Sequence, residues 1–349
     1  MSQKAFLVLE NGTIFQGVSF GATGEAAGEV VFTTGMGGYL ETLTDPGYFG
    51  HIVVQTFPLI GNCGVISDDF ESESISAKAY IINNLCQGPS NFRSEGDLGT
   101  FLLQQNIIGL SGIDTRQLTK IIRESGAMQG KIVLKDPAGV TFPKTPAQDC
   151  VAAVSTKEIS TVGRGERLIA LLDLGAKKSI AKSLAERGAK VITFPHNTTA
   201  AEILAANPNG IVLSNGPGDP ANPANTPIIE TIRTLMQSNI PIFGICLGHQ
   251  LLAIANGYTT RKMKFGHRGA NQSVKDLATG RIYATGQNHG YEVIAGNPSF
   301  ININDRSCEG LDYGRSFSVQ FHPGSSGGPK ETDFLFDKFV ERMDTYAAE

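Results

Sequence analysis

The sequence predicts an α/β protein in which a smaller α+β domain precedes a doubly wound, mostly parallel sheet. Three observations predict this. Strand-like and helix-like segments alternate after about residue 167, strands predominate in the first part, and residues 146–166 mix Pro, Thr, Ala, Ser and Gly with little periodicity. A length of 349 residues fits two domains. We therefore expect an α+β domain over 1–145, a linker over 146–166 and an α/β domain over 167–349.

The first domain is expected to open as a β-hairpin. Asn11-Gly12, a strong turn signal, joins two short apolar runs. The last helical pattern of this domain has Asp114 as a candidate N-cap and Gly126 as a candidate C-cap. The expected strands are 5–10, 13–20, 29–34 and 51–57, and the expected helices are 76–85 and 114–126.

The second domain is expected to be built from βαβ units. Four apolar runs of strand length each precede a segment with helical periodicity. In such sheets, functional sites form at the carboxyl ends of the strands. The expected strands are 168–175, 190–195, 210–216 and 241–246, and the expected helices are 177–188, 199–207, 226–238 and 248–257.

Composition and charge exclude several classes of protein. The formal net charge is −4 and there is no long basic run, so we expect neither nucleic acid nor an anionic membrane as the main partner. No stretch reaches the roughly 18 apolar residues of a membrane helix, and the first residues lack the layout of a secretory signal, so a cytoplasmic protein is expected. The five cysteines are scattered without a CxxC pair, which favours neither a disulfide framework nor a metal site.

The segment from Gly244 to Gly248 has the Gly-x-nucleophile-x-Gly pattern, with Cys246 where many hydrolases have Ser. It lies between an expected strand and an expected helix, and so tight a turn leaves little room for flanking side chains. The helix N-terminus would lower the pKa of the Cys246 thiol, and the N–H of Leu247 would point towards an oxyanion. Taken alone, the pattern is also compatible with a buried structural cysteine between two glycines.

A nucleophilic cysteine needs a general base, and His322 has the best position of the six histidines. It follows the strand-like run 316–321 and precedes Pro323, and a histidine at the end of a parallel strand can reach the turn of a neighbouring strand. The alternative, a hydrogen-bonded loop histidine, stays open. His249, on the helix of the turn, is expected to be structural, and His289 is expected to lie in a loop.

A loop rich in Gly and Pro, residues 214–220, follows the third expected strand of the second domain. Its backbone N–H groups around Gly216 and Gly218 can supply a second oxyanion donor or hold a polar substrate. A plain tight turn is equally compatible. The loop lacks the Gly-Lys-Ser/Thr ending of a nucleotide-binding P-loop, and no P-loop is found elsewhere in the sequence.

Together, this loop, the cysteine turn and the pair His322-Pro323 resemble the class I glutamine amidotransferases, over about 167–349. The entire first domain and two segments of the second resemble the small subunit of carbamoyl-phosphate synthetase. The matching segments are 28–46, 57–62, 90–94, 112–130, 262–274 and 286–293.

The resemblance implies a glutaminase. Cys246 would attack the side-chain amide of L-glutamine and form a γ-glutamyl thioester, while His322 would take the thiol proton and pass it to the departing ammonia. Backbone N–H groups of Leu247 and of the loop glycines Gly216 and Gly218 would hold the oxyanion. The residues that would hold the amino-acid end of the substrate are Gln250, Asn288, Gly290 and Tyr291.

The resemblance also implies a partner. Ammonia would pass through an internal tunnel to a large synthetase subunit, which would carry the ATP, Mg and bicarbonate chemistry. This agrees with the missing P-loop, and the chain itself would need no cofactor. The carbamoyl phosphate formed by this heterodimer would serve arginine or pyrimidine biosynthesis.

Two positions depart from the family pattern. The usual His-Pro-Glu, whose Glu orients the histidine, here ends in Gly324, and the usual Thr-Asp-Pro-Ser, whose Ser contacts glutamine, here ends in Gly47. Ser325, Ser326 or a water are candidates to replace the acid. Because a cysteine thiolate is intrinsically nucleophilic, we expect a working but weakened glutaminase, in which Gly324→Glu raises turnover.

Two other functions compete with this hypothesis. In one, the two glycines inactivate the site, and the chain mainly docks on and regulates a synthetase. In the other, the chain is a glutaminase that feeds a different synthase, such as anthranilate or aminodeoxychorismate synthase. The first domain argues against the latter, because those glutaminases usually lack it.

Overall fold

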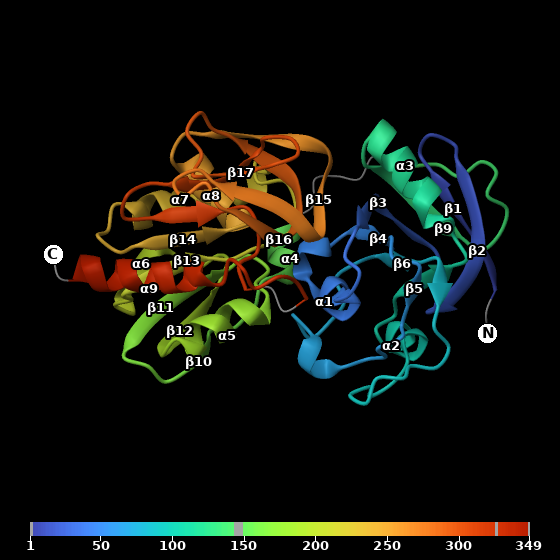
Figure 1. The fold of residues 1–349 in the computed structure, drawn as a ribbon, viewed down its shortest axis with the longest axis horizontal. Helices are drawn as coiled ribbons and strands as arrows, with labels where there is room; N and C mark the ends of the chain where they lie inside the picture. The colour runs from blue at the N-terminus through green and yellow to red at the C-terminus, as the bar shows by residue number, and fades with distance from the viewer. Residues whose placement is uncertain (1–2, 143–148, 325–326, 348–349) are drawn as a thin grey trace. The chain divides into compact units, whose positions relative to one another are not determined.

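The computed structural model describes residues 3–142, 149–324 and 327–347, and the chain divides into two compact units (Figure 1). Unit 1 comprises Met1–Gln148 together with Lys264–Gly269. Unit 2 comprises Asp149–Met263 and Ala270–Glu349. Among the helices in the described ranges, none has the length and apolar character needed to cross a membrane.

Unit 1 is built on a closed barrel with the strand order β1-β2-β8-β6-β4-β3-β9. β3, β4, β6 and β8 run parallel to their neighbours in this group, whereas β1, β2 and β9 pair antiparallel. The predicted hairpin is confirmed as β1 and β2. The elements are β1 (Lys4–Leu9), β2 (Ile14–Gly21), β3 (Ala26–Thr33), α1 (Tyr39–Thr44), η1 (Pro46–Tyr48), β4 (His51–Gln55), β5 (Leu59–Ile60), η2 (Ser67–Asp69), β6 (Ala79–Ile81), β7 (Asn84–Leu85), α2 (Leu98–Gln104), β8 (Ile108–Ser111), α3 (Thr115–Ser125) and β9 (Met128–Val133).

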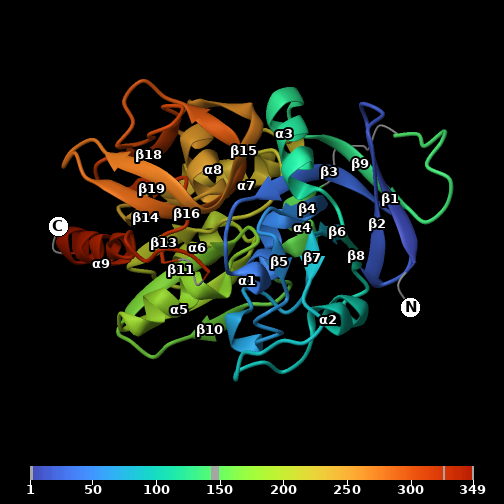
Figure 2. The same ribbon diagram turned by 45° about the vertical axis from the view of Figure 1, so that its right-hand side comes forward.

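The barrel strands β3, β4 and β6 are apolar on both faces, so unit 1 has two cores. Along β4, Ile52 and Val54 pack in one core with Leu118 of α3, while Val53 packs in the other with Phe101 of α2. Successive residues of a strand point to opposite faces, which divides the two sets. Figure 2 accordingly shows α2 and α3 on opposite sides of β4 and β6.

The prediction of a helix at residues 76–85 is wrong, because the strands β6 and β7 lie in this segment. Ala79 and Ile81 face one core, and Tyr80 and Ile82 face the other. A short apolar run that is buried on both faces has no alternation that distinguishes it from a buried helix. The helix predicted at 114–126 is confirmed as α3, which Asp114 caps by accepting a hydrogen bond from the N–H of Gln117.

Unit 2 contains a ten-stranded sheet with the order β10-β12-β11-β13-β14-β19-β18-β16-β15-β17. The strands β12, β11, β13, β14 and β19 are mutually parallel, and antiparallel strands extend both edges. The elements are α4 (Cys150–Val154), β10 (Ser160–Val162), β11 (Arg167–Asp173), α5 (Lys178–Glu186), β12 (Ala189–Pro195), α6 (Ala200–Ala205), β13 (Gly210–Leu213), η3 (Pro223–Asn225), α7 (Thr226–Met236), β14 (Ile242–Ile245), α8 (Leu247–Ala255), β15 (Thr259–Asp276), β16 (Ile282–Ile294), β17 (Phe300–Asn302), β18 (Cys308–Asp312), β19 (Phe317–Val319) and α9 (Phe334–Ala347).

Helices cover both faces of the parallel strands, so the doubly wound α/β fold is confirmed. Leu184 of α5 and Phe339 of α9 pack in the core on one face. Ile232 of α7 and Leu251 of α8 pack in the core on the other face, as the ribbon in Figure 1 shows. All four predicted strand–helix pairs of this unit are present. This topology places the carboxyl ends of β11, β13 and β14 at one edge of the sheet.

The prediction of an irregular linker is wrong from Asp149 onwards, because α4 and β10 lie in this segment. Asp149 caps α4 by accepting a hydrogen bond from the N–H of Ala152, and β10 adds an antiparallel edge strand to β12. The three residues of β10 are all exposed, so the segment has no apolar alternation that would predict a strand. Residues 146–148 of the predicted linker lie outside the described residues.

Candidate active site

Cys246 lies on the sharp turn between β14 and α8. Its φ of 55° and ψ of −104° are uncommon for a residue with a side chain, and such strain is typical of functional sites. The flanking glycines have a steric reason. A Cβ at Gly248 would lie 2.2 Å from the carbonyl oxygen of Leu213, and a Cβ at Gly244 would lie 2.8 Å from that of Gly248. Strand and helix therefore approach so closely that only glycine fits on either side of the cysteine.

Cys246 and His322 each form a hydrogen bond with the same strand, β16. The N–H of Cys246 donates to the carbonyl of Val319 at 2.9 Å, which ties the turn to the end of β19. The Cys246 thiol donates to the carbonyl of Asn288 at 3.6 Å, and the N–H of His322 donates to the carbonyl of Gly286 at 2.9 Å. Gly286 and Asn288 are two residues apart, about 7 Å along a strand, and their carbonyls point the same way. The thiol of Cys246 and the backbone of His322 therefore contact the same stretch of β16.

The sulfur of Cys246 is covered by protein. The residue is 2% exposed and packs in the core formed with β14, β19 and α9, and His322 is 6% exposed. Both groups therefore lie in a dry environment, in which electrostatic interactions are stronger than in water.

The loop 214–220 packs against the first turn of α8. A Cβ at Gly216 would lie 2.8 Å from the Leu247 side chain and 2.1 Å from the carbonyl of Leu174. The N–H of Gly248 donates to the carbonyl of Ser214 at 3.0 Å, and Gly218 has a φ of 95°. The backbone of Leu247, at the first position of the helix, therefore lies beside this loop, as an oxyanion site built from both requires.

The residues predicted to hold the amino-acid end of glutamine also gather here. Asn288, Gly290 and Tyr291 all lie on one short stretch of β16. Gln250, on α8 and 3% exposed, donates from Nε2 to the carbonyl of Tyr291 at 2.9 Å and to the side chain of Gln320 at 3.0 Å. These contacts lock the side chain of Gln250 against the strand that also contacts Cys246.

Two other histidines have structural positions. His249 is completely buried on α8, and its Nδ1 lies 2.8 Å from the Ser318 hydroxyl. Burial lowers the pKa of His249 to about 3, so its imidazole is neutral near pH 7. The loop predicted for His289 is wrong: His289 lies in β16 with its ring nitrogens 2.8 Å from the carbonyl of Tyr291 and 2.9 Å from the side chain of Gln287.

The two glycines that depart from the family pattern lie in different units. Gly47 belongs to η1 in unit 1, where its N–H donates to the carboxylate of Asp45 at 2.8 Å. Gly324 follows His322 in unit 2 with a φ of 66°. A Cβ at Gly324 would lie 2.5 Å from Oδ1 of Asp333, whose other oxygen pairs with Arg187 at 2.7 Å. Ser325 and Ser326, the candidates to replace the missing acid, lie outside the described residues.

Sequence reasoning did not single out Gln320, Asp333 or Lys177. Lys177, just beyond β11 and 5% exposed, adds a buried amino group to unit 2, and its backbone N–H donates to the Asn215 side chain at 3.1 Å. Nothing in the pattern distinguishes this lysine from those of the helix that follows. Gln320 directly follows β19, and a polar side chain in this largely apolar run was the only signal for it.

Two family models match the chain. The model described as "Carbamoyl-phosphate synthase small chain, CPSase domain" matches residues 7–132, and "Glutamine amidotransferase class-I" matches residues 170–342. A carbamoyl phosphate synthase small chain of Bacillus cereus is 46% identical over 361 residues, with 99% of this chain and 98% of the relative covered. A pyrimidine-specific small chain of Bacillus subtilis is 46% identical over 359 residues, with 98% and 96% covered. A small chain of Clostridium perfringens is 44% identical over 349 residues, with 97% and 99% covered.

Proposed function

The chain belongs to the family of carbamoyl phosphate synthase small chains, and on that premise we propose that it hydrolyses L-glutamine at Cys246 and passes the ammonia to a large subunit. The observation that carries the proposal is the turn at Cys246. A strained cysteine between two glycines that admit no Cβ opens a helix, and the strand that contacts its thiol also pairs with His322.

The proposed reaction begins with proton transfer from the Cys246 thiol to His322. The sulfur then attacks the amide carbon of glutamine, and His322 returns the proton to the nitrogen as the C–N bond breaks and ammonia leaves. A γ-glutamyl thioester remains on Cys246. Water, deprotonated by His322, attacks this thioester, and the C–S bond breaks to release glutamate and restore the thiol.

The negative oxygen of each tetrahedral intermediate needs donors. We assign this role to the N–H of Leu247 and to an N–H of the loop glycines Gly216 and Gly218. The packing of this loop against Leu247 supports the assignment.

The amino-acid end of glutamine is assigned to the surface formed by α8 and β16. Because Nε2 of Gln250 already donates to Tyr291 and Gln320, its Oε1 is the atom that can accept from the substrate ammonium. Asn288, Gly290 and Tyr291 complete this end. Gly47 takes the place of a serine that contacts glutamine in the family, so one substrate hydrogen bond is missing in this chain.

The proposed partner is a large subunit that carries the ATP, Mg and bicarbonate chemistry, and we propose that this chain needs no cofactor of its own. The names of the relatives support this division, because a small chain implies a large one. The heterodimer would convert glutamine-derived ammonia into carbamoyl phosphate.

Glutamate release from glutamine, measured with the large subunit present, tests the function. Cys246→Ala is expected to lower the rate by at least about 10³-fold. Cys308→Ala is the matched control: Cys308 is also buried, burial raises the pKa of its thiol to about 12, and its loss should leave the rate largely unchanged. Equal rates in wild type and Cys246→Ala would contradict the proposal.

A second function, a docking and regulatory scaffold, is favoured by two observations: Gly324 offers no carboxylate to orient His322, and Cys246 is 2% exposed. A scaffold would raise the activity of the large subunit with free ammonia while releasing no glutamate from glutamine. The same assay with ammonia in place of glutamine separates the two functions, because a glutaminase loses only the glutamine-dependent rate when Cys246 is replaced.

A further inference from the structure

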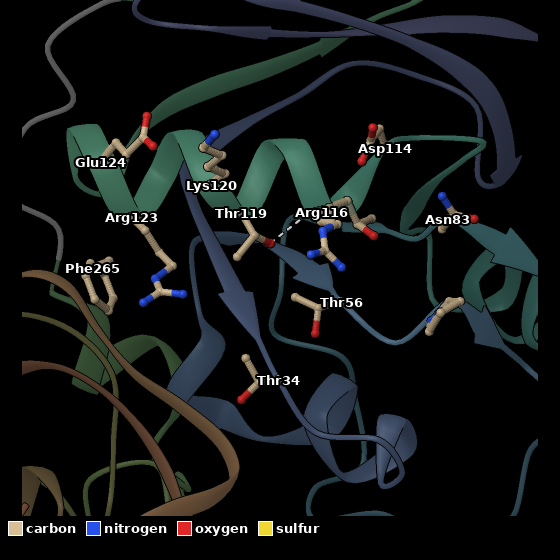
Figure 3. Close-up of a pocket in the computed structure, with 12 residues that line it drawn as sticks. Thr34, Thr56, Asn83, Asp114, Arg116, Thr119, Lys120, Arg123, Glu124 and Phe265 are labelled. Carbon is tan, nitrogen blue, oxygen red and sulfur yellow. Dashed lines mark hydrogen bonds between the residues drawn. The ribbon is translucent and has the colours of Figure 1, made fainter. Parts of the chain in front are cut away.

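Unit 1 has a cavity of about 920 Å³ beneath α3, and charged side chains of both signs line it (Figure 3). A cleft attracts a charged ligand when its wall carries one sign of charge, and this wall carries both. The charged residues of the wall are Asp114, Arg116, Lys120, Arg123 and Glu124. In unit 2, by contrast, four polar side chains are buried beside the proposed glutamine site, where a polar group without a hydrogen-bond partner is costly.

The buried polar side chains lie between β19 and α8. The apolar residues of the run 317–321 pack in the core with α9, and Ser318 and Gln320 alternate with them, so these two point to the opposite face, towards α8. The hydroxyl of Ser318 lies 2.8 Å from Nδ1 of His249, and Oε1 of Gln320 accepts a hydrogen bond from Nε2 of Gln250 at 3.0 Å. One strand thus contacts two successive residues of α8 through buried polar groups.

These contacts allow only one orientation of the Gln250 amide. Its Nε2 donates both of its protons, one to the carbonyl of Tyr291 at 2.9 Å and one to Oε1 of Gln320. A backbone carbonyl can only accept, so a flipped amide would set Oε1 of Gln250 against the oxygen of Tyr291. The amide oxygen of Gln250 is therefore the atom left for a substrate.

Gln320 makes this contact although its own side chain is only half satisfied. Its side chain is completely buried, and its Nε2 meets no acceptor among the residues that the structure describes. A methionine would fill a similar volume in this run without a buried amide donor. Because unsatisfied buried polar groups are rare and cluster at functional sites, the retained amide indicates that its oxygen is needed by Gln250.

We propose that Gln320 is a positioning residue that favours substrates with an α-ammonium group. It accepts from Gln250 and so holds the oxygen of that amide towards the ammonium of L-glutamine, and it acts only through Gln250. Without Gln320, one N–H of Gln250 loses its acceptor and Tyr291 alone holds the amide. This inference rests on the proposed glutaminase function, and it adds a residue that sets the substrate preference of the same site.

Glutamate release from L-glutamine, measured with the large subunit and with glutaramate as a competitor, tests the role of Gln320. Glutaramate has the same amide and carboxylate as glutamine but lacks the α-amino group. Gln320→Met should raise the KM for L-glutamine at least about tenfold and leave kcat within about twofold, because the lost contact acts on substrate binding. The inhibition constant of glutaramate should stay unchanged. Gln320→Glu keeps an acceptor oxygen for Gln250 and should restore the wild-type KM.

Ser318→Ala is the matched control, since Ser318 is equally buried on the same face and contacts His249 instead of Gln250. It should lower the unfolding temperature and leave the KM for L-glutamine and the inhibition constant of glutaramate unchanged. Three results would overturn the proposal: a wild-type KM in Gln320→Met, an equal loss of glutaramate binding in that variant, or a KM in Gln320→Glu as high as in Gln320→Met. Wild type that released no glutamate would instead contradict the glutaminase function itself.

Discussion

Cys246 combines a strained backbone with an almost completely covered sulfur. A side chain at φ 55° and ψ −104° costs on the order of 1–3 kcal/mol, and it persists because the contacts around Gly244 and Gly248 leave the chain no other path. The same close packing holds the nucleophile in one fixed position at the start of α8.

Replacement of His249 should make unit 2 less sensitive to acid. Burial holds the pKa of His249 at about 3 in the folded chain, against 6.5 when unfolded, so protonation favours the unfolded state. Its stability contribution is complete above pH 6.5 and is lost as the pH falls towards 3, by about 1.4 kcal/mol per pH unit. His249→Asn should be less stable at pH 7.5 but should lose stability less steeply between pH 6.5 and 4.5. Urea unfolding followed by circular dichroism at several pH values measures this, and parallel pH dependences would refute it.

Gly324→Glu alone should not restore the missing acid. The positive φ costs a residue with a Cβ about 1–2 kcal/mol, and that Cβ would lie 2.5 Å from Oδ1 of Asp333. The single variant should unfold at a lower temperature and gain no glutaminase rate. Gly324→Glu combined with Asp333→Gly should release glutamate faster than Asp333→Gly alone, because the carboxylate then has room beside His322. A single Gly324→Glu variant that is as stable as wild type and more active would show that Asp333 moves aside freely.

At the scale of residues, spacing predicted that Cys246 and His322 each follow a strand of one parallel sheet, and β14 and β19 are indeed parallel neighbours. It could not predict Asp333, whose position next to Gly324 depends on the turn before α9 and on its pairing with Arg187. The sequence also could not predict the contact of Gln250 with Gln320, because the two residues are 70 positions apart in the chain.

At the scale of elements, the approach of α8 to β13 can be tested with glycine substitutions. Gly248→Ala places a methyl group 2.2 Å from a backbone carbonyl, which cannot move without disturbing β13, and should cost about 1–3 kcal/mol and displace Cys246. Gly296→Ala is the control, because a Cβ there meets nothing within 4 Å, and its effect should stay within about 0.5 kcal/mol. Thermal unfolding and glutamate release of both variants measure the difference. Similar losses in both would mean that the close approach does not hold the turn in place.

The elements that could be predicted are those with a clear period. Each strand–helix pair of unit 2 from β11 to α8 combines a continuous apolar run with an amphipathic segment. The long strands β15 and β16 could not be predicted in this way, since β15 is mostly partly exposed and rich in charged and polar residues. His289 was placed in a loop because it stands between Asn288 and Gly290, although pairing with β18 and β15 makes the segment the strand β16.

At the scale of the whole molecule, the closure of the barrel in unit 1 is what the sequence could not reveal. β1 pairs with β9, with Leu7 opposite Ile132, and no local pattern encodes a contact over such a separation. The parallel arrangement of β3, β4, β6 and β8, which creates the cavity beneath α3, follows from the same closure. The α+β domain predicted over 1–145 therefore contains a closed barrel.

The central claim, a γ-glutamyl thioester on Cys246, is tested most directly by trapping it. The chain with its large subunit is mixed with radiolabelled glutamine, quenched in acid within one turnover and digested, and the labelled peptide is identified by mass spectrometry. We predict that the label is bound to the peptide containing Cys246, is released by mild base as expected for a thioester, and is absent in Cys246→Ser. Glutamate formation at the normal rate with no label on this peptide would contradict the mechanism.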